Sequence, residues 1–309
     1  MAIPMPTAEV DVTAGLVREL LAAQHPDLAR LPVEFLANGW DNANFRLGEQ
    51  LLARMPRRAL GAQIIAHEQR WLPVVAPRLP LPIPCPSRTG VPGPGFPYPW
   101  SVVPYLPGVA AAGADGGGVP LDLAAVAAQL GGFLRALHVT APADAPANPF
   151  RGVPLSQRAA TFEVNLALLA GSASARSSRT QPPIVDEAAV RHAWAQALAA
   201  PAYDGPPLWL HGDLHPANVL VQHGHVSGII DFGDITAGDP APDLSVAWML
   251  LPPRWHDAFR VAYGGVGDDL WRRARGWALA LGVVFLAHSA DNPQIHGIGR
   301  RTVAAILEG

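Results

Sequence analysis

The spacing of apolar residues changes along this chain, and that change restricts the fold more than any other feature. Between residues 33 and 56, short apolar runs alternate with polar residues and are separated by turn residues. This pattern predicts three short strands in an antiparallel meander. From residue 122 onward, apolar residues instead recur every three or four positions, which predicts helices. We therefore expect an α+β protein with a small β-rich N-terminal lobe and a larger, mainly helical C-terminal lobe.

The individual elements follow from the same patterns. Strands are predicted at residues 33–36, 45–47, 51–55 and 100–106, and helices at 11–29, 61–75, 123–137, 186–199, 243–250, 254–263 and 268–289. Segments rich in small residues predict a hinge at 107–120 and an exposed loop at 171–183. The hinge places the N-terminal lobe at residues 1–106 and the C-terminal lobe at residues 107–309.

The composition excludes several classes of function. The formal net charge is −3, so the chain lacks the basic surplus of a nucleic-acid-binding protein. Its longest uncharged apolar stretch, residues 276–287, is shorter than the ~20 residues that cross a bilayer. The N-terminus lacks the pattern of a signal peptide, and the single cysteine, Cys85, cannot form an internal disulfide. We expect a cytoplasmic protein without membrane contacts, and nothing in the sequence specifies an oligomeric state.

The segment from Leu208 to Gly233 presents three polar side chains next to apolar strands. Asp213 and Asn218 share one loop, and Asp231 follows a predicted hairpin. Phosphoryl transfer needs a carboxylate that orients the attacking hydroxyl, and an amide oxygen with a second carboxylate that hold Mg²⁺ against nucleotide phosphates. Each residue alone is also typical of a turn or a helix cap. Their combination favours phosphoryl transfer.

Longer motifs surround these residues. They are His211-Gly212-Asp213-Leu214-His215-Pro216 with Asn218, Ile230-Asp231-Phe232-Gly233, Gly39-Trp40-Asp41-Asn42, Pro99-Trp100-Ser101, Leu134-Arg135-Ala136-Leu137-His138, and Gly238-Asp239-Pro240-Ala241 with Asp243-Leu244. Together they resemble the aminoglycoside phosphotransferase family, relatives of the protein kinases, over most of the chain.

This resemblance implies a two-lobed, protein-kinase-like fold that binds ATP or GTP between a nucleotide-binding N-terminal lobe and a catalytic, acceptor-binding C-terminal lobe. It implies that Asp213 is the catalytic base and that Asn218 and Asp231 are ligands of Mg²⁺. It further implies that Asp243 braces the catalytic loop.

One departure from the family pattern is the absence of lysine, since all 22 basic residues are arginine. Kinase-like enzymes hold the α- and β-phosphates with a lysine on the third strand, paired with a helix glutamate. Here the third predicted strand carries Arg54, and the following helix carries Glu68. Arginine is permanently charged and binds phosphate bidentately, so we expect Arg54 to take this role. Arg57 and Arg58 are alternatives, and an ordinary surface ion pair worth about 0–1 kcal/mol is another.

Two further segments are candidates for nucleotide contacts. The predicted turn at Gly39–Asn44 would cover the phosphates, with Gly39 and Asn42 as binding residues, although Gly and Asn also make ordinary hairpin turns. Val103 and Tyr105 would offer backbone groups to the base, but Pro104 between them has no N–H donor.

The acceptor is expected to be a hydroxylated small molecule. Residues 141–200 and 254–309, which would form its binding wall, each contain more arginines than acidic residues. A pocket for a polycationic aminoglycoside would instead need an acidic surplus, so we expect a less cationic acceptor.

Two other functions remain open. A pseudokinase that binds nucleotide without catalysis would explain the missing lysine. His211, Asp213 and His215 form a His-x-Asp-x-His pattern that would suit a transition-metal hydrolase.

Overall fold

The computed structural model describes residues 6–113, 120–175 and 185–308. The chain forms two compact units. Among the described residues, the N-terminal unit contains Pro6–Pro107 together with Gly228–Gly233, and the C-terminal unit contains those from Gly108 to Ser227 and from Asp234 onward. A five-stranded antiparallel sheet in the first unit and a mainly helical second unit confirm the predicted α+β class.

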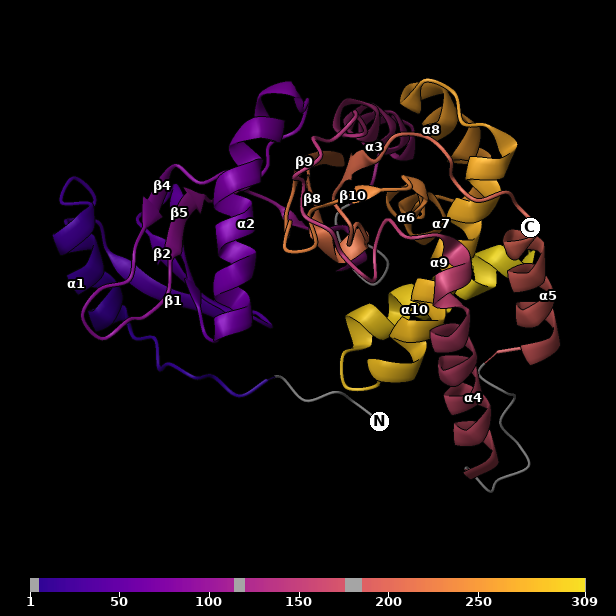
Figure 1. Ribbon diagram of the computed structural model, residues 1–309, viewed down its shortest axis with the longest axis horizontal. Coiled ribbons are helices and arrows are strands. Elements are labelled where there is room, and N and C mark those ends of the chain that lie inside the picture. The colour runs from indigo at the N-terminus through magenta and orange to yellow at the C-terminus, as the bar shows by residue number, and fades with distance from the viewer. Residues whose placement is uncertain (1–5, 114–119, 176–184, 309) are drawn as a thin grey trace. The chain divides into compact units, whose positions relative to one another are not determined.

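The N-terminal sheet is the predicted meander extended by two later strands. Its strands are β1 (Val33–Asn38), β2 (Asn42–Leu47), β3 (Leu51–Pro56), β4 (Arg88–Gly90) and β5 (Trp100–Pro104), in the spatial order β1-β2-β3-β5-β4. Two helices, α1 (Ala14–Gln24) and α2 (Ala59–Val75), flank this sheet (Figure 1). Because side chains alternate along strands, Phe45, Ala53 and Val102 lie side by side in one core with the apolar face of α1.

The first hairpin is tighter than its Gly- and Asn-containing sequence suggests. We expect a turn over Gly39–Asn44, but β2 already begins at Asn42, which pairs with Pro56 of β3. Pairing on both sides of β2 outweighs the turn preference of asparagine. Residues 39–41 alone therefore connect β1 with β2.

Residues 228–233 pack with the N-terminal unit although they come late in the chain. They begin with the last two residues of β9 (His225–Ile229), and the Ile229 N–H donates to the Pro82 carbonyl at 3.0 Å. A Cβ on Gly228 would lie 2.9 Å from a methyl carbon of Leu106, so this position accepts only glycine without displacement. The N-terminal unit is thus completed by a segment that is distant in sequence.

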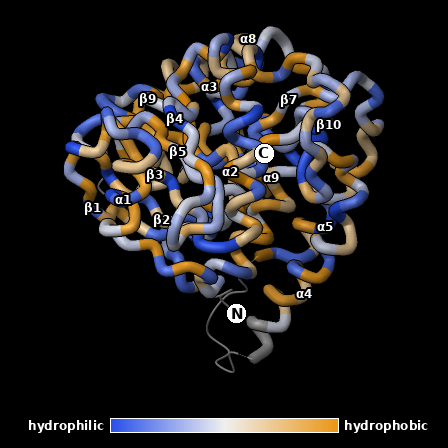
Figure 2. Tube along the Cα trace, turned by 60° about the vertical axis from the view of Figure 1, so that its left-hand side comes forward, coloured by the Kyte–Doolittle hydropathy of each residue, from blue (hydrophilic) through white to orange (hydrophobic). Residues whose placement is uncertain are grey.

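The C-terminal unit is built around one long helix, α9. Its helices are α3 (Leu123–Leu137), α4 (Ala159–Ala175), α5 (Glu187–Leu198), α6 (Ala241–Leu244), α7 (Val246–Leu250), α8 (His256–Tyr263), α9 (Asp268–His288) and α10 (Pro293–Glu308). Helix α9 contacts α4, α5, α6, α7 and α10. Its stretch from Gly276 to Ala287 is mostly apolar, as the hydropathy colours of Figure 2 show, and most of these residues are buried. Among the described residues, no helix combines the length and apolarity that a membrane span requires.

Two parts of the C-terminal unit differ from the sequence predictions. Residues 171–175, which we expect in a loop, continue α4, although glycine and serine are weaker helix formers than alanine; residues 176–184 lie outside the described part of the chain. The predicted hinge begins with a short strand, β6 (Val109–Ala110), that pairs with β8 (Val219–Gln222), and its residues 114–119 are not described. Helix α10 is absent from the sequence predictions.

Two adjacent glycines of α3 provide a test of the packing between α3 and α8. A Cβ on Gly131 would lie 2.5 Å from the Phe259 carbonyl oxygen, whereas a Cβ on Gly132 would meet nothing within 4 Å. We expect Gly131→Ala to lower the free energy of unfolding by about 1–3 kcal/mol through overpacking. Gly132→Ala should raise it by about 0.5–1 kcal/mol through helix propensity. Chemical denaturation measures both, and equal effects of the two substitutions would contradict this packing.

Candidate active site

The loop of residues 211–218 is held by a pair of short strands in the C-terminal unit. Strand β7 (Leu208–Leu210) leads into it and pairs antiparallel with β10 (Thr236–Gly238). At Gly212 the backbone adopts φ +87°, and a Cβ would lie 2.3 Å from the Asp234 carbonyl oxygen, so the turn requires glycine. The loop ends in a single 3₁₀ turn, Pro216–Asn218, that runs into β8.

The Asp243 carboxylate anchors this loop from α6. It accepts the backbone N–H groups of His211 (2.7 Å) and Gly212 (2.9 Å), and the His138 Nε2 lies 3.1 Å from its Oδ2. Because a carboxylate accepts hydrogen bonds, His138 donates through Nε2, and its Nδ1 faces the Tyr263 hydroxyl at 3.0 Å. Burial and the nearby Asp243 charge raise the pKa of Tyr263, so its hydroxyl keeps its proton. Asp243 therefore braces the loop, as the family resemblance implies.

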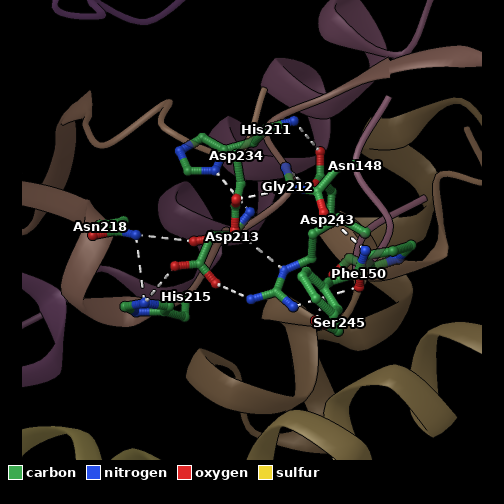
Figure 3. A network of polar contacts seen from close by, with 12 residues as sticks. Asn148, Phe150, His211, Gly212, Asp213, His215, Asn218, Asp234, Asp243 and Ser245 are labelled. Carbon is green, nitrogen blue, oxygen red and sulfur yellow. Dashed lines mark hydrogen bonds and ion pairs between the residues drawn. The ribbon is translucent and has the colours of Figure 1, made fainter. Parts of the chain in front are cut away.

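Asp213 is at the centre of the polar network in Figure 3. The Arg151 Nη2 lies 3.0 Å from its Oδ1, and the His215 Nε2 lies 3.4 Å from its Oδ2. Burial opposes ionisation, but the neighbouring His215, Arg151 and His211 outweigh burial and lower the pKa of Asp213 well below its ordinary range. With 28% of its side chain exposed, Asp213 is an ionised carboxylate within reach of solvent.

Asn218 is fixed to the same loop. Its Nδ2 donates to the Asp213 backbone carbonyl at 2.9 Å and lies 3.4 Å from His215 Nε2 (Figure 3). Since the amide nitrogen is used as the donor, the amide oxygen of Asn218 is the atom left to bind a cation. This arrangement brings together two of the sequence-predicted site residues, Asp213 and Asn218.

The His-x-Asp-x-His pattern does not form a ligand cluster. His211 Nδ1 accepts the Asp213 N–H, and His215 Nδ1 accepts the Ala217 N–H, both at 3.2 Å. Within residues 6–113, 120–175 and 185–308, no three His, Cys, Asp or Glu side chains gather as metal ligands. The two histidines instead shape the loop backbone.

Arg54 and Glu68 form a buried ion pair in the N-terminal unit. Arg54 Nη1 lies 2.6 Å from Glu68 Oε2, and their side chains are 11% and 1% exposed. Burial opposes the charge of Arg54, but Glu68 and Asp231 outweigh it and raise the pKa of the guanidinium. The other Glu68 oxygen, Oε1, is buried without a hydrogen-bond partner in the described part of the chain. Arg54, Glu68 and Asp231 therefore act on one another within this unit.

The two alternative arginines make other contacts. Arg58 pairs with Asp41 at 2.6 Å, and Arg57 Nη1 donates to the Gly39 carbonyl at 3.4 Å. Both lie near the turn that connects β1 with β2, whereas Arg54 lies within β3.

Asp231 has an uncommon backbone conformation. Its φ of +64° is left-handed, a region in which residues other than glycine are strained by about 1–3 kcal/mol. Its side chain is exposed, while the following Phe232 is fully buried and fixes the segment. Strain of this kind concentrates at functional sites. The carboxylate of Asp231 is a hard oxygen donor of the type that Mg²⁺ prefers, and so is the amide oxygen of Asn218.

The remaining residues that the sequence predicts to contact the nucleotide are buried or use their backbone groups in hydrogen bonds within the protein. Asn42 lies buried in β2, and its carbonyl accepts the Gly39 N–H at 2.7 Å. Tyr105 donates its N–H to the Gln50 carbonyl at 2.7 Å, and Val103 is 1% exposed. Pro104 has no N–H and the Tyr105 N–H is already bonded, so neither residue has a backbone donor left for a nucleotide base.

Sequence reasoning missed Arg151 and Asp234. Arg151 pairs with Asp213 at 3.0 Å and lies 3.6 Å from Asp234, which also accepts a hydrogen bond from Asn148 at 2.9 Å. The segment Asn148–Gly152 is short and contains three turn residues, and nothing in its spacing relates Arg151 to Asp213, 62 positions away.

Removal of the Asp243 charge tests the loop anchor. We expect Asp243→Asn to lower the free energy of unfolding by about 2–4 kcal/mol, because two backbone N–H groups lose a buried charged acceptor. Asp269→Asn is the matched control, since Asp269 forms an exposed pair with Arg272 and should change stability by less than about 1 kcal/mol. Chemical denaturation compares the two; equal stabilities would mean that Asp243 does not anchor the loop.

Comparison with known proteins shows the family to which the chain belongs. A family profile, that of the phosphotransferase enzyme family (APH), matches residues 32–277. Among solved structures, the GDP complex of aminoglycoside 2'-phosphotransferase-IIIa is similar with a TM-score of 0.61, 20% identity, and coverage of 96% of this chain and 99% of that one. Macrolide 2'-phosphotransferase MphH from Brachybacterium faecium has a TM-score of 0.58 at 20% identity, covering 93% and 97%.

A curated relative, the uncharacterized protein YcbJ of Bacillus subtilis (strain 168), is 29% identical over 65 residues, which span about a fifth (21%) of each protein. The structural similarity extends over nearly the whole chain, and the family match covers most of it. This chain belongs to the phosphotransferase enzyme family.

Proposed function

We propose that this protein transfers the γ-phosphoryl group of ATP or GTP to a hydroxyl group of a small molecule. The observation that carries the proposal is the Asp213 loop. In it, an ionised and partly exposed carboxylate is fixed next to Asn218 and is anchored from behind by buried Asp243. Family membership supports the same reaction class.

In the proposed reaction the acceptor oxygen forms a bond to the γ-phosphorus while the bond to the β-phosphate oxygen breaks. The acceptor hydroxyl donates a hydrogen bond to Asp213, which orients the oxygen and receives its proton as the new bond forms. A nucleoside diphosphate and a phosphate monoester leave. The lowered pKa keeps Asp213 ionised, so its carboxylate can accept the hydrogen bond that orients the hydroxyl.

Asn218 and Asp231 would hold Mg²⁺. Bound there, the ion would neutralise charge on the transferred phosphate oxygens and align them. The hydrogen bond from Asn218 Nδ2 to the Asp213 carbonyl fixes the amide group of Asn218, and the left-handed backbone of Asp231 sets the direction in which its side chain leaves the chain.

Arg54 would neutralise the α- and β-phosphates in place of a lysine. Its pairing with Glu68 leaves further N–H donors of the guanidinium for phosphate oxygens. Because nucleoside triphosphates are the phosphoryl donors of the cytoplasm, we place the reaction there.

The acceptor would be a hydroxylated small molecule. Solved relatives of this fold include a complex with kanamycin and a complex with streptomycin, so antibiotics belong in the set of acceptors to be tested. Other hydroxylated metabolites belong there equally, because the arginine content of residues 141–200 does not suit a polycation.

A library screen tests the proposal. Purified protein with MgATP or MgGTP would be incubated with antibiotics and hydroxylated metabolites, and products would be read by mass spectrometry as a gain of one phosphoryl group. Phosphorylation of at least one acceptor is expected. Thermal stabilisation by nucleotide with no product and no nucleoside diphosphate would instead favour the pseudokinase.

Two charge-removing substitutions test the assigned roles. Asp213→Asn should lower kcat by roughly 10²–10⁴-fold with little change in nucleotide binding, because the amide cannot accept the proton. Asp231→Asn keeps a side chain that tolerates left-handed backbone, so its expected loss of activity would report the charge rather than strain. Steady-state kinetics and thermal melting are the measurements. Full activity of either variant would refute its role.

Substitutions of Arg54 test the phosphate contact. Arg54→Lys should retain more activity than Arg54→Met, because it keeps the positive charge near the phosphates. Since Arg54→Met alone leaves Glu68 buried without its partner, the double variant Arg54→Met/Glu68→Gln separates folding from binding. The double variant should melt near the wild type and raise the nucleotide KM about 10–100-fold. An unchanged KM would point to Arg57 or Arg58.

A further inference from the structure

Arg151 is the one cation within hydrogen-bond distance of Asp213 that comes from outside the 211–218 loop, among the contacts of the described residues. Its Nη2 lies 3.0 Å from Asp213 Oδ1, its Nε lies 3.6 Å from Asp234 Oδ2, and its side chain is 16% exposed. Arg151 has no assigned role in the phosphoryl transfer proposed for Asp213.

The segment that carries Arg151 is rigidly placed. Asn148 donates to the Asp234 carboxylate at 2.9 Å, and the Asp239 N–H donates to the Gly152 carbonyl at 3.0 Å. Gly152 has φ +67°, and a Cβ on Gly238 would lie 2.1 Å from the Gly152 oxygen. Two glycines thus allow the backbones to meet closely, and this close contact positions Arg151 beside Asp213.

Much of the donor capacity of Arg151 is unused. A guanidinium has five N–H donors, and here one short hydrogen bond, to Asp213, accounts for one of them. The Nη1 reaches the Phe150 carbonyl only at 3.5 Å, and the Nε is buried without a hydrogen-bond partner among the described residues. The Nε faces Asp234, so the donors that remain for an oxygen-bearing ligand at Asp213 are those of the two Nη groups.

A second arginine adds to the positive charge. The Arg158 guanidinium lies over the ring of exposed Phe150, 5.7 Å from its centroid, and has no acidic partner in the described part of the chain. Burial and the nearby charge of Arg151 lower the pKa of Arg158, which indicates that the two cations act on one another. Arg151, Arg158 and Phe150 therefore form one cationic and aromatic wall.

We propose that Arg151 is a positioning and specificity-determining residue: it orients the Asp213 carboxylate and, together with Arg158, selects acceptors that carry no cationic amine beside the reacting hydroxyl. The inference rests on the proposed function. An ammonium group beside that hydroxyl would come close to the guanidinium that is already 3.0 Å from Asp213, and like charges at such distances repel strongly. A neutral hydroxyl or a carboxylate there would instead accept hydrogen bonds from the unused donors.

Scaffold-matched acceptors test the selection. Starting from each acceptor found in the library screen, three versions are compared in which the group beside the reacting hydroxyl is an amine, a hydroxyl or a carboxylate. For the wild type we expect kcat/KM at least about tenfold lower for the amine version than for the hydroxyl version, mainly through KM. Equal or faster turnover of amine versions would overturn the proposal while leaving the phosphotransferase function intact.

Two variants and a control assign the selection to Arg151. Arg151→Gln removes the charge, so the amine-to-hydroxyl ratio of kcat/KM should rise about tenfold or more, while kcat for the hydroxyl version falls because Asp213 loses its orienting partner. Arg151→Lys should restore the discrimination, a rescue that a merely structural role would not give. Arg191→Gln removes an equal charge from an exposed pair with Glu187 and should leave the ratio unchanged.

The outcomes separate the two proposals. An unchanged ratio in Arg151→Gln, with a melting temperature near that of the wild type, would overturn the inference alone. If no library member were phosphorylated by the wild type, the proposed function would itself fail.

Discussion

The site depends on one buried carboxylate that contacts backbone rather than substrate. Asp243 is fully buried and accepts the first two N–H groups of the loop that follows β7, so the loop direction is set from behind. His138 and Tyr263 complete this buried chain of hydrogen bonds. Because the loop is anchored there, the side chains of Asp213 and Asn218 remain available on its other side. The two backbone N–H groups need acceptors where water is absent, and the two oxygens of the Asp243 carboxylate provide them.

Charge compensation differs between the two units. In the N-terminal unit Arg54 and Glu68 are buried partners, and exposed Asp231 adds a second carboxylate near the same guanidinium. In the C-terminal unit Asp213 is surrounded by Arg151 and by ring nitrogens, so a carboxylate that would serve as base is held ionised. A chain without lysine thus uses arginine at both places. Arginine brings a planar fork with several donors to each, which suits recognition of oxygen atoms on phosphates and acceptors.

Much of this could be predicted from local sequence. The meander over residues 33–56 and the capped helix after Asp122 follow from hydrophobic period and end signals, and the structure has both. The pairing of Asn218 with the Asp213 loop and of Arg54 with Glu68 also agrees with the motif spacing. The approach of Arg151 to Asp213 could not be predicted, because it depends on two strands and two glycines far apart in the chain. The local sequence predicts Asn42 in a turn, but pairing with β3 places it in strand β2, because strand pairing outweighs local turn preference.

The late segment at residues 228–233 has a consequence for how the chain can be divided. Its backbone is hydrogen-bonded to Pro82, and its glycines lie against Leu106 and Ile64, so the N-terminal unit is incomplete until the chain has been made as far as residue 233. A fragment that stops at residue 107 would expose that docking surface to water. During synthesis on the ribosome, the first unit would therefore acquire its last segment only after the whole loop that carries Asp213 has emerged.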